Sequence, residues 1–152
     1  MSTGNAHDRL RRLRRWAGPV EAAQVRRFGR SILSTLYRTP VLVLETTGRR
    51  SGRLRRTTLA YHRDTDGSLL VVGGAGGQTR TPDWVANLRS QGRCTLVVNR
   101  LRREADATEL VGDDRATTWR QLREVFPRID QYEKAAGRPV PVFRFEDVDG
   151  DG

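Results

Sequence analysis

Five arginines lie within eight residues, 49–56, between two apolar stretches typical of β-strands. Gly48 and Gly52 border the turn, and the arginines are Arg49, Arg50, Arg53, Arg55 and Arg56. A guanidinium group presents a planar fork of N–H donors that fits a phosphate or a carboxylate. Glycine accepts positive φ values, which lets backbone N–H groups converge on the same anion. The segment therefore predicts an anion-binding corner, for example for a phosphorylated cofactor, or a solvated hairpin turn.

A second glycine-rich segment, residues 73–77, follows an apolar run and precedes Thr81-Pro82-Asp83, a signal for the start of a helix. This order brings bare backbone and a helix N-terminus to one place, which also suits an anion. The spacing matches neither a P-loop nor the GxGxxG dinucleotide fingerprint. An exposed surface loop is the alternative. If the two strands before these corners are neighbours, the corners lie side by side.

Nucleophiles and metal ligands are scarce in this sequence. His7 and His62 are the only histidines, and neither has a Cys or His neighbour at metal-ligand spacing. Cys94 is the only cysteine and lies in an apolar, strand-like stretch, where a small buried thiol is expected. We therefore expect no metal site and no acid–base dyad. A single cysteine also forms no intrachain disulfide, which fits a reducing, cytoplasmic compartment.

The net charge of +10 is unevenly distributed along the 152 residues. Residues 1–39 carry nine arginines against Asp8 and Glu21, which gives +7, and the rest of the chain supplies +3. The chain has 27 arginines and one lysine, a skew that genome composition also produces. Nucleic-acid binding is therefore a less favoured alternative, and we expect no nucleic-acid partner.

The basic N-terminal segment shows helical periodicity over residues 8–37. Leu10, Leu13 and Trp16 recur on one side, and arginines fill the other. Such a helix either caps the rest of the molecule or lies on an anionic membrane surface, at the inner face of the cell membrane. No apolar run reaches the roughly 18–20 residues needed to cross a bilayer.

From residue 40 onward the pattern is mainly β. Strands are predicted over 41–46, 56–63, 68–73, 93–99, 104–111 and 140–145, with turns at 64–67 and 100–103. Helices are predicted over 81–90, 112–125 and 130–136. We expect an α+β fold, a small antiparallel barrel with packed helices. The predicted domains are a basic amphipathic helical segment (1–39), the barrel (40–146) and a disordered tail (147–152).

An ordered set of motifs over about residues 38–146 resembles the deazaflavin-dependent nitroreductase family. The set comprises Thr46-Thr47-Gly48-Arg49-Arg50-Ser51-Gly52 with Arg55 and Leu59, Gly76-Gly77, Pro82-x-Trp84-x-x-Asn87-Leu88, Phe126-Pro127, Tyr132 and Arg138-Pro139-Val140-Pro141-Val142. The resemblance implies a split β-barrel of the flavin-reductase, FMN-binding type that holds coenzyme F420, a phosphorylated deazaflavin. The resemblance also implies an enzyme that transfers hydride to quinones, nitroaromatics or other electron-poor conjugated compounds.

The resemblance also implies a set of cofactor-binding positions. Arg49, Arg50, Ser51 and Arg55 would grip the phosphate and acidic tail of the coenzyme, with Thr57, Thr58 and Leu59 beside it on the next strand. Gly74, Ala75, Gly76, Gly77, Arg80, Thr81 and Pro82 would line the deazaflavin, and Trp84, Asn87 and Leu88 would build the pocket wall. Tyr132 would lie at the substrate end, either donating a hydrogen bond to the acceptor or packing on the barrel.

Because such a cofactor carries the redox chemistry itself, an enzyme without an acid–base dyad is consistent with this sequence. The expected partner is a small-molecule electron acceptor, and the protein is expected to be a monomer or a homodimer. Two alternatives stay open. FMN would satisfy the same anion-binding logic in place of F420, and a carrier would bind either cofactor without catalysing turnover.

Overall fold

A computed structural model describes residues 39–74 and 79–148, and these belong to one compact unit that begins at Thr39. The helix predicted over residues 8–37 therefore lies outside the described residues. The strands are β1 (Val41–Thr47), β2 (Leu54–Ala60), β3 (His62–Arg63), β4 (Leu69–Val72), β5 (Arg93–Val98), β6 (Leu101–Glu109) and β7 (Val142–Asp147). The helices are α4 (Asp83–Gln91), α5 (Gly112–Val125) and α6 (Ile129–Ala136).

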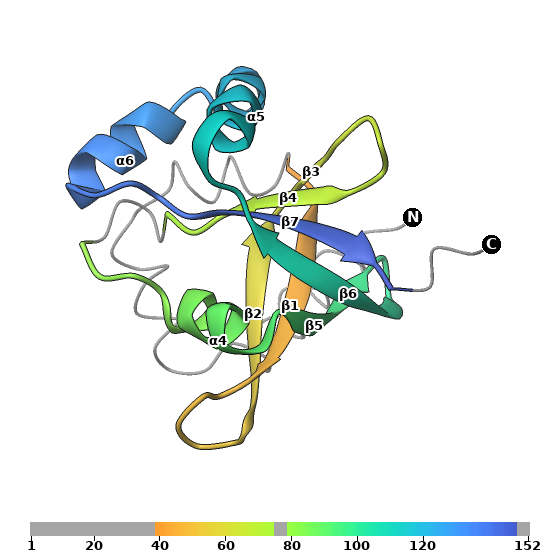
Figure 1. The fold of residues 1–152 in the computed structure, drawn as a ribbon. Helices are drawn as coiled ribbons and strands as arrows, with labels where there is room; N and C mark the ends of the chain where they lie inside the picture. Colours follow the sequence, from red (N-terminus) through yellow and green to blue (C-terminus); the bar gives the residue numbers. More distant parts are fainter. Residues whose placement is uncertain (1–38, 75–78, 149–152) are drawn as a thin grey trace, which may run out of the picture. The chain divides into compact units, whose positions relative to one another are not determined.

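All the described strands join one antiparallel sheet in the order β2-β1-β5-β6-β7-β4-β3. The sheet curls (Figure 1), and its two ends approach each other because β2 contacts β4 without pairing with it. This curled half-barrel agrees with the small antiparallel barrel expected from the sequence. Side chains alternate across it, so that Leu42 and Leu44 of β1 face the interior while Glu45 faces the opposite side.

The interior of the curled sheet is filled by apolar side chains from the strands and by one face of α4. Trp84 of α4 lies against Phe143 of β7, with ring centroids 5.7 Å apart, and Leu88 is 1% exposed. Burying one large apolar side chain stabilises the fold by about 1.5–3 kcal/mol. α4 is thus anchored to the core by its apolar face, and its polar face remains available for contacts outside the core.

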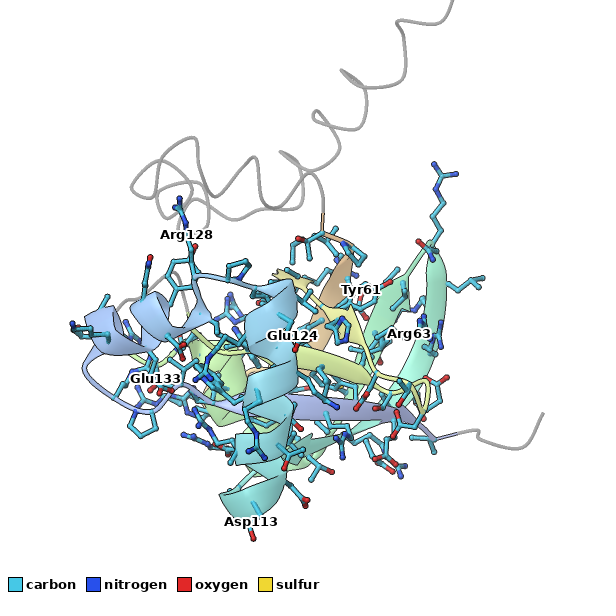
Figure 2. The ribbon with its side chains drawn as sticks, turned by 90° about the horizontal axis from the view of Figure 1, so that it is seen from above. Tyr61, Arg63, Asp113, Glu124, Arg128 and Glu133 are labelled. Carbon is cyan, nitrogen blue, oxygen red and sulfur yellow. The ribbon has the colours of Figure 1, made fainter. Side chains whose placement is uncertain are left out.

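A second apolar cluster lies on the other face of β4 and β7, under α5 and α6. Leu70 of β4 and Val142 of β7 pack there with Trp119 and Leu122 of α5. Figure 2 shows α5 lying across the sheet between its labelled residues Asp113 and Glu124. Both helices lie over β4 and β7, away from the β1–β2 hairpin (Figure 1).

The strand predicted over residues 56–63 is in fact two strands. β2 pairs with β1, whereas β3 pairs with β4 at the far end of the sheet order. Between them the buried Tyr61 donates its backbone N–H to the Pro40 carbonyl oxygen at 3.1 Å. The chain crosses from one edge of the curled sheet to the other at this residue, a long-range event that a continuous β pattern does not reveal.

Several other predicted boundaries differ from the structure; β2, for example, begins at Leu54 rather than at residue 56, and β6 ends at Glu109 rather than at residue 111. The turn of the β5–β6 hairpin is confined to Asn99 and Arg100, both with positive φ, so residues 101–103 belong to β6. The helix predicted over residues 81–90 begins at Asp83, with Pro82 as its N-cap, and ends at Gln91. The last strand begins at Val142 instead of residue 140 and ends at Asp147, inside the predicted tail, where Asp147 pairs with Arg103 at 2.8 Å.

Candidate functional site

The hairpin between β1 and β2 carries the arginine cluster on a turn of defined shape. Its backbone is closed by hydrogen bonds from the Gly48 N–H to the Arg53 carbonyl (2.7 Å) and from the Gly52 N–H to the Gly48 carbonyl (2.9 Å). Gly52 has a φ of +66°, which favours glycine. A Cβ on Gly48 would lie 2.6 Å from Ser51 Oγ, so a side chain there would displace Ser51. Both glycines thus shape the turn, Gly52 through its positive φ and Gly48 through its close approach to Ser51.

Alternation along β2 divides the arginines between two faces of the sheet. Arg55, Thr57 and Leu59 share one face, and Leu59 packs against the interior cluster. Arg56 and Thr58 point to the other face, where Arg56 Nε donates to Glu45 Oε1 at 2.8 Å. Arg56 is therefore engaged by a structural ion pair. Thr58, predicted to run beside the cofactor with Thr57 and Leu59, is separated from them by the strand.

Glu45 is a buried carboxylate held by two arginines on that outer face. Arg102 of β6 donates to both of its oxygens at 3.0 and 2.8 Å, in addition to the contact from Arg56. Burial raises the pKa of Glu45, but the hydrogen bonds from Arg56 and Arg102 outweigh burial, so that its pKa lies below the ordinary value. The ion pairs tie β1, β2 and β6 together behind the arginine hairpin.

The polar face of α4 holds the start of the hairpin in place. Asn87 Oδ1 accepts the backbone N–H of Arg49 at 3.1 Å, and Asn87 Nδ2 donates to Thr46 Oγ1 at 3.4 Å. One helical turn further on, Gln91 bonds both backbone groups of Thr47, accepting from its N–H at 3.3 Å and donating to its carbonyl oxygen. Asn87 therefore acts on the site through the hairpin.

The second predicted corner meets the arginine hairpin at the first turn of α4. Asp83 Oδ1 lies 3.1 Å from Arg80 Nη2 and 3.8 Å from Arg49 Nη1. The Arg80 and Asp83 side chains are 80% and 65% exposed, and that of Arg49 is 30% exposed. Figure 1 shows the β1–β2 turn beside α4. Two cations from separate loops thus lie beside a helix N-terminus, open to solvent, which suits an anionic ligand.

The described part of the glycine-rich segment is packed tightly. The Gly73 N–H donates to the Pro141 carbonyl at 2.7 Å, and a Cβ on Gly73 would lie 3.0 Å from Val85 Cγ2. Gly74 is buried next to Val140, and Thr81 and Pro82 are half-buried before α4. The predicted residues Ala75, Gly76 and Gly77 lie outside the described residues.

The remaining predicted site residues fall into two groups. Trp84 and Leu88 lie in the interior core cluster, where they support α4 from below. Arg50 and Ser51 are exposed on the hairpin turn, and Tyr132 is half-buried on α6, a different element from the arginine hairpin. The structure thus brings Arg49, Arg80 and Asn87 together around α4, and places Tyr132 on a separate helix.

Among the described residues, the other reactive groups form no second candidate site. Cys94 is buried, and burial, with a smaller contribution from the Asp106 carboxylate, raises the pKa of its thiol to about 12. Within residues 39–74 and 79–148, no three His, Cys, Asp or Glu side chains are grouped so that they could hold a metal ion. In the same ranges no helix combines the length and apolar character of a membrane span.

Two residues of the site, Asp83 and Gln91, were not predicted from the sequence as functional. Together with Asn87 they repeat every four residues, which places all three on one face of α4. That polar stripe on a helix whose other face is apolar is a signal that the sequence contains. Its target, the arginine hairpin about forty residues earlier, is set by the tertiary fold.

Comparison with known proteins gives consistent matches. The family model described as F420H(2)-dependent quinone reductase matches residues 19–147. An F420H(2)-dependent quinone reductase of Mycobacterium tuberculosis is 33% identical over 106 residues, which are 68% of this chain and 70% of that protein. A solved F420-H2 dependent reductase, FDR-A, superposes with a TM-score of 0.62 at 27% identity, covering 70% of this chain and 94% of that one. A structure described as a domain-swapped dimer matches with the same TM-score and identity, over 70% and 80% of the two chains.

Proposed function

Because this chain belongs to the F420H(2)-dependent quinone reductase family, we propose that it transfers a hydride from reduced coenzyme F420 to a quinone, a nitroaromatic or another electron-poor conjugated acceptor. Family membership makes the chain an oxidoreductase that uses coenzyme F420. The acceptor and the residues that bind coenzyme and acceptor are the parts that we propose.

The observation that carries the proposal is the meeting of two arginines from separate loops at the start of α4. Arg49 and Arg80 both lie within 4 Å of Asp83, beside the N-terminus of the helix. Guanidinium groups and backbone N–H groups are the donors that a phosphate and an acidic tail require, so the residues present fit the coenzyme. We assign its anionic end to Arg49, Arg50, Ser51 and Arg55, assisted by Arg80.

The rest of the coenzyme would lie along residues that continue from this corner. Thr57 and Leu59 share the face of Arg55 on β2 and would line one side. Residues 74–77, Thr81 and Pro82 would line the deazaflavin, with Trp84 and Leu88 supporting the wall from the core. We assign no contact to Thr58, which faces the other side of the sheet.

The coenzyme supplies the hydride, so the protein contributes binding, orientation and exclusion of water. Arginine contacts at the anionic end would hold and orient the coenzyme, and the residues that line the deazaflavin would exclude water. An acceptor held about 3–3.5 Å from the coenzyme would be in a near-attack arrangement. The Tyr132 hydroxyl would donate a hydrogen bond to the acceptor oxygen as negative charge develops there. No proton transfer from a dyad is needed in this scheme.

A titration of the purified protein with coenzyme F420 and with FMN, followed by fluorescence, tests the coenzyme assignment. We expect saturable binding of F420, and oxidation of reduced F420 when menadione is added. Saturable binding without turnover of any acceptor would point to a carrier. Preferred binding of FMN, or salt-sensitive DNA binding without cofactor affinity, would contradict the proposal.

The role of Tyr132 is tested with Tyr132→Phe, which removes only the hydroxyl. We expect kcat with menadione to fall about tenfold or more while the Kd for F420 stays unchanged, because the hydroxyl acts on the acceptor in the transition state. An unchanged kcat would assign Tyr132 to packing.

We also propose that the basic segment 1–39 contacts an anionic membrane surface at the inner face of the cell membrane. We treat this segment as distinct from the barrel domain over residues 40–146 and from the tail 147–152. The support is in the sequence, where eight arginines and Trp16 accompany an apolar helical stripe over residues 8–37. Deleting residues 1–37 should reduce binding to anionic liposomes. Equal binding by the full and truncated chains, both still binding F420, would contradict it.

A further inference from the structure

Arg138 lies in the connection between α6 and β7 and bonds two successive carbonyl groups of another loop. Its Nε donates to the Thr79 carbonyl at 2.9 Å, and its Nη2 donates to the Arg80 carbonyl at 3.1 Å. We propose that Arg138 is a positioning residue for coenzyme binding, which orients the segment before α4 so that the Arg80 side chain reaches the anion site. This inference rests on the proposed function, because it concerns the same site.

The two contacts restrain consecutive peptide units of the loop. The Arg80 Cα joins these two units, and the Arg80 side chain is 80% exposed, so that among the described residues its direction depends mainly on the backbone and on Asp83. Pro82, two residues later, has its φ fixed by its ring and is the N-cap of α4. The backbone that carries Arg80 is thus restrained on both sides, by Arg138 and by the proline.

Arg138 can serve as an anchor because its own connection is held in place. Gly137, in the left-handed conformation, closes α6 with hydrogen bonds from its N–H to the Glu133 and Lys134 carbonyls. Two residues beyond Arg138, the Val140 N–H donates to Glu133 Oε2 at 3.0 Å. The connection therefore starts and ends at fixed points on α6.

A polar cluster on α5 reinforces that frame. Arg115 Nη2 donates to Glu133 Oε2 at 2.8 Å and to the Val140 carbonyl at 2.7 Å, and the Arg115 guanidinium lies 4.7 Å from the Trp119 ring centroid. Figure 2 labels Glu133 on α6 beside α5. Charge-assisted hydrogen bonds of this kind are among the stronger ones in proteins. The connection that carries Arg138 is thus held to α5 and α6 by several hydrogen bonds.

The consequence is a chain of contacts from α6 to the arginine hairpin. Arg138 holds the backbone of Arg80, the Arg80 guanidinium bonds Asp83, and Asp83 lies next to Arg49. Without Arg138, the loop gains conformational freedom, and ordering it on binding costs free energy that the coenzyme contacts must supply. The contribution of Arg80 to coenzyme affinity therefore depends on Arg138.

A double-mutant cycle tests this dependence. The Kd for coenzyme F420 is measured by fluorescence titration for the full-length wild type, Arg80→Ala, Arg138→Ala and the double variant. We expect Arg80→Ala to raise the Kd about fivefold and Arg138→Ala about tenfold, and the double variant to stay near tenfold. Factors that multiply to about fiftyfold, or an unchanged Kd for Arg138→Ala, would overturn the inference.

Two further measurements separate positioning from general destabilisation. Arg120→Ala, an exposed arginine on α5, is the matched control and should leave the Kd unchanged, with the effect of Arg80→Ala intact on this background. Arg138→Lys keeps the charge but lacks the fork that spans two carbonyls, so it should restore only part of the affinity. If Arg138→Ala does not fold, the same cycle with Arg138→Lys decides.

Saturation kinetics separate impaired coenzyme binding from impaired catalysis. With F420 saturating, the kcat of Arg138→Ala with menadione should return close to the wild-type value, because only coenzyme binding is impaired. A kcat that remains reduced at saturation would contradict positioning. If the wild type itself does not bind F420, the proposed function fails. If it binds and the cycle is multiplicative, only the role of Arg138 fails.

Discussion

The side-chain oxygen of Asn87 accepts two hydrogen bonds from Arg49, one from its backbone N–H at 3.1 Å and one from Nη1 at 3.4 Å. One amide on α4 thus fixes both the backbone and the guanidinium of the first arginine in the hairpin. Since Asn87 is 3% exposed, water does not replace it there. α4 therefore fixes the position of the Arg49 guanidinium in the absence of a ligand.

Replacing Asn87 separates its support of the hairpin from its effect on charge. Asn87→Ala should lower the free energy of unfolding by about 1–2 kcal/mol and weaken F420 binding five- to tenfold, because Arg49 loses its acceptor. Asn87→Asp keeps both acceptor bonds and should recover stability, but it adds a negative charge beside the anion site and should still bind F420 weakly.

The matched control for Asn87 is Ser90→Ala, an exposed position on the same helix, which should change neither quantity. Urea unfolding and fluorescence titration measure the two effects. Wild-type F420 affinity in Asn87→Ala would show that the hairpin keeps its shape without the helix, against the structure.

Adjacent glycines at the end of β4 should differ in their tolerance of a methyl group. In Gly73→Ala the new Cβ would lie 3.0 Å from Val85 Cγ2, and Val85 is fully buried and β-branched, so it cannot move aside easily. We expect a loss of stability of about 1–2 kcal/mol. In Gly74→Ala the nearest atom is Val140 Cγ1 at 3.6 Å, an ordinary contact, and stability should change little. Thermal unfolding compares the two variants, and equal melting temperatures would contradict the packing described.

The Glu45 ion pairs should contribute stability that depends on pH. Since the hydrogen bonds from Arg56 and Arg102 hold the pKa of folded Glu45 below its ordinary value of 4.5, the unfolded chain binds a proton more readily. The contribution is therefore fully present above the ordinary pKa and is lost as pH falls through the lower folded value.

Glu45→Gln should accordingly cost about 1–3 kcal/mol near pH 7 and clearly less near pH 3. Urea unfolding of wild type and variant at both pH values measures the difference. A cost that stays the same at both pH values would show that the carboxylate charge is not what stabilises the fold.

Much of the fold was predictable because local patterns determine it. Apolar runs ending in turn residues, such as Val41–Thr47 before Gly48, identified the strands, and Asp64 to Gly67 identified a turn that the structure confirms, with Gly67 at a φ of +88°. The division of residues 56–63 at Tyr61 was missed because it depends on strand pairing across the curled sheet.

The two anion-prone corners were expected to lie side by side if the strands before them were neighbours, but those strands, β1 and β4, are not adjacent in the sheet. The corners meet instead at the start of α4, where Gln91 and Arg138 hold them through contacts with residues 44 and 58–59 positions away in sequence. Contacts at such separation leave no local periodicity. The separation of Arg55 from Arg56 follows from alternation along β2, but the strand predicted over residues 56–63 left Arg55 in the turn, so the sequence analysis did not identify it.

The central claim is that the arginine hairpin binds the anionic end of coenzyme F420, and one titration tests it most directly. The Kd for F420 is compared between the wild type, the Arg49→Ala/Arg55→Ala variant and the control variant Arg93→Ala/Arg120→Ala, whose arginines are exposed on β5 and α5. Loss of two charge-assisted hydrogen bonds predicts at least about a hundredfold weaker binding in the first variant. The control variant should match the wild type, with unchanged melting temperatures throughout. Equal affinity in all three proteins would contradict the account.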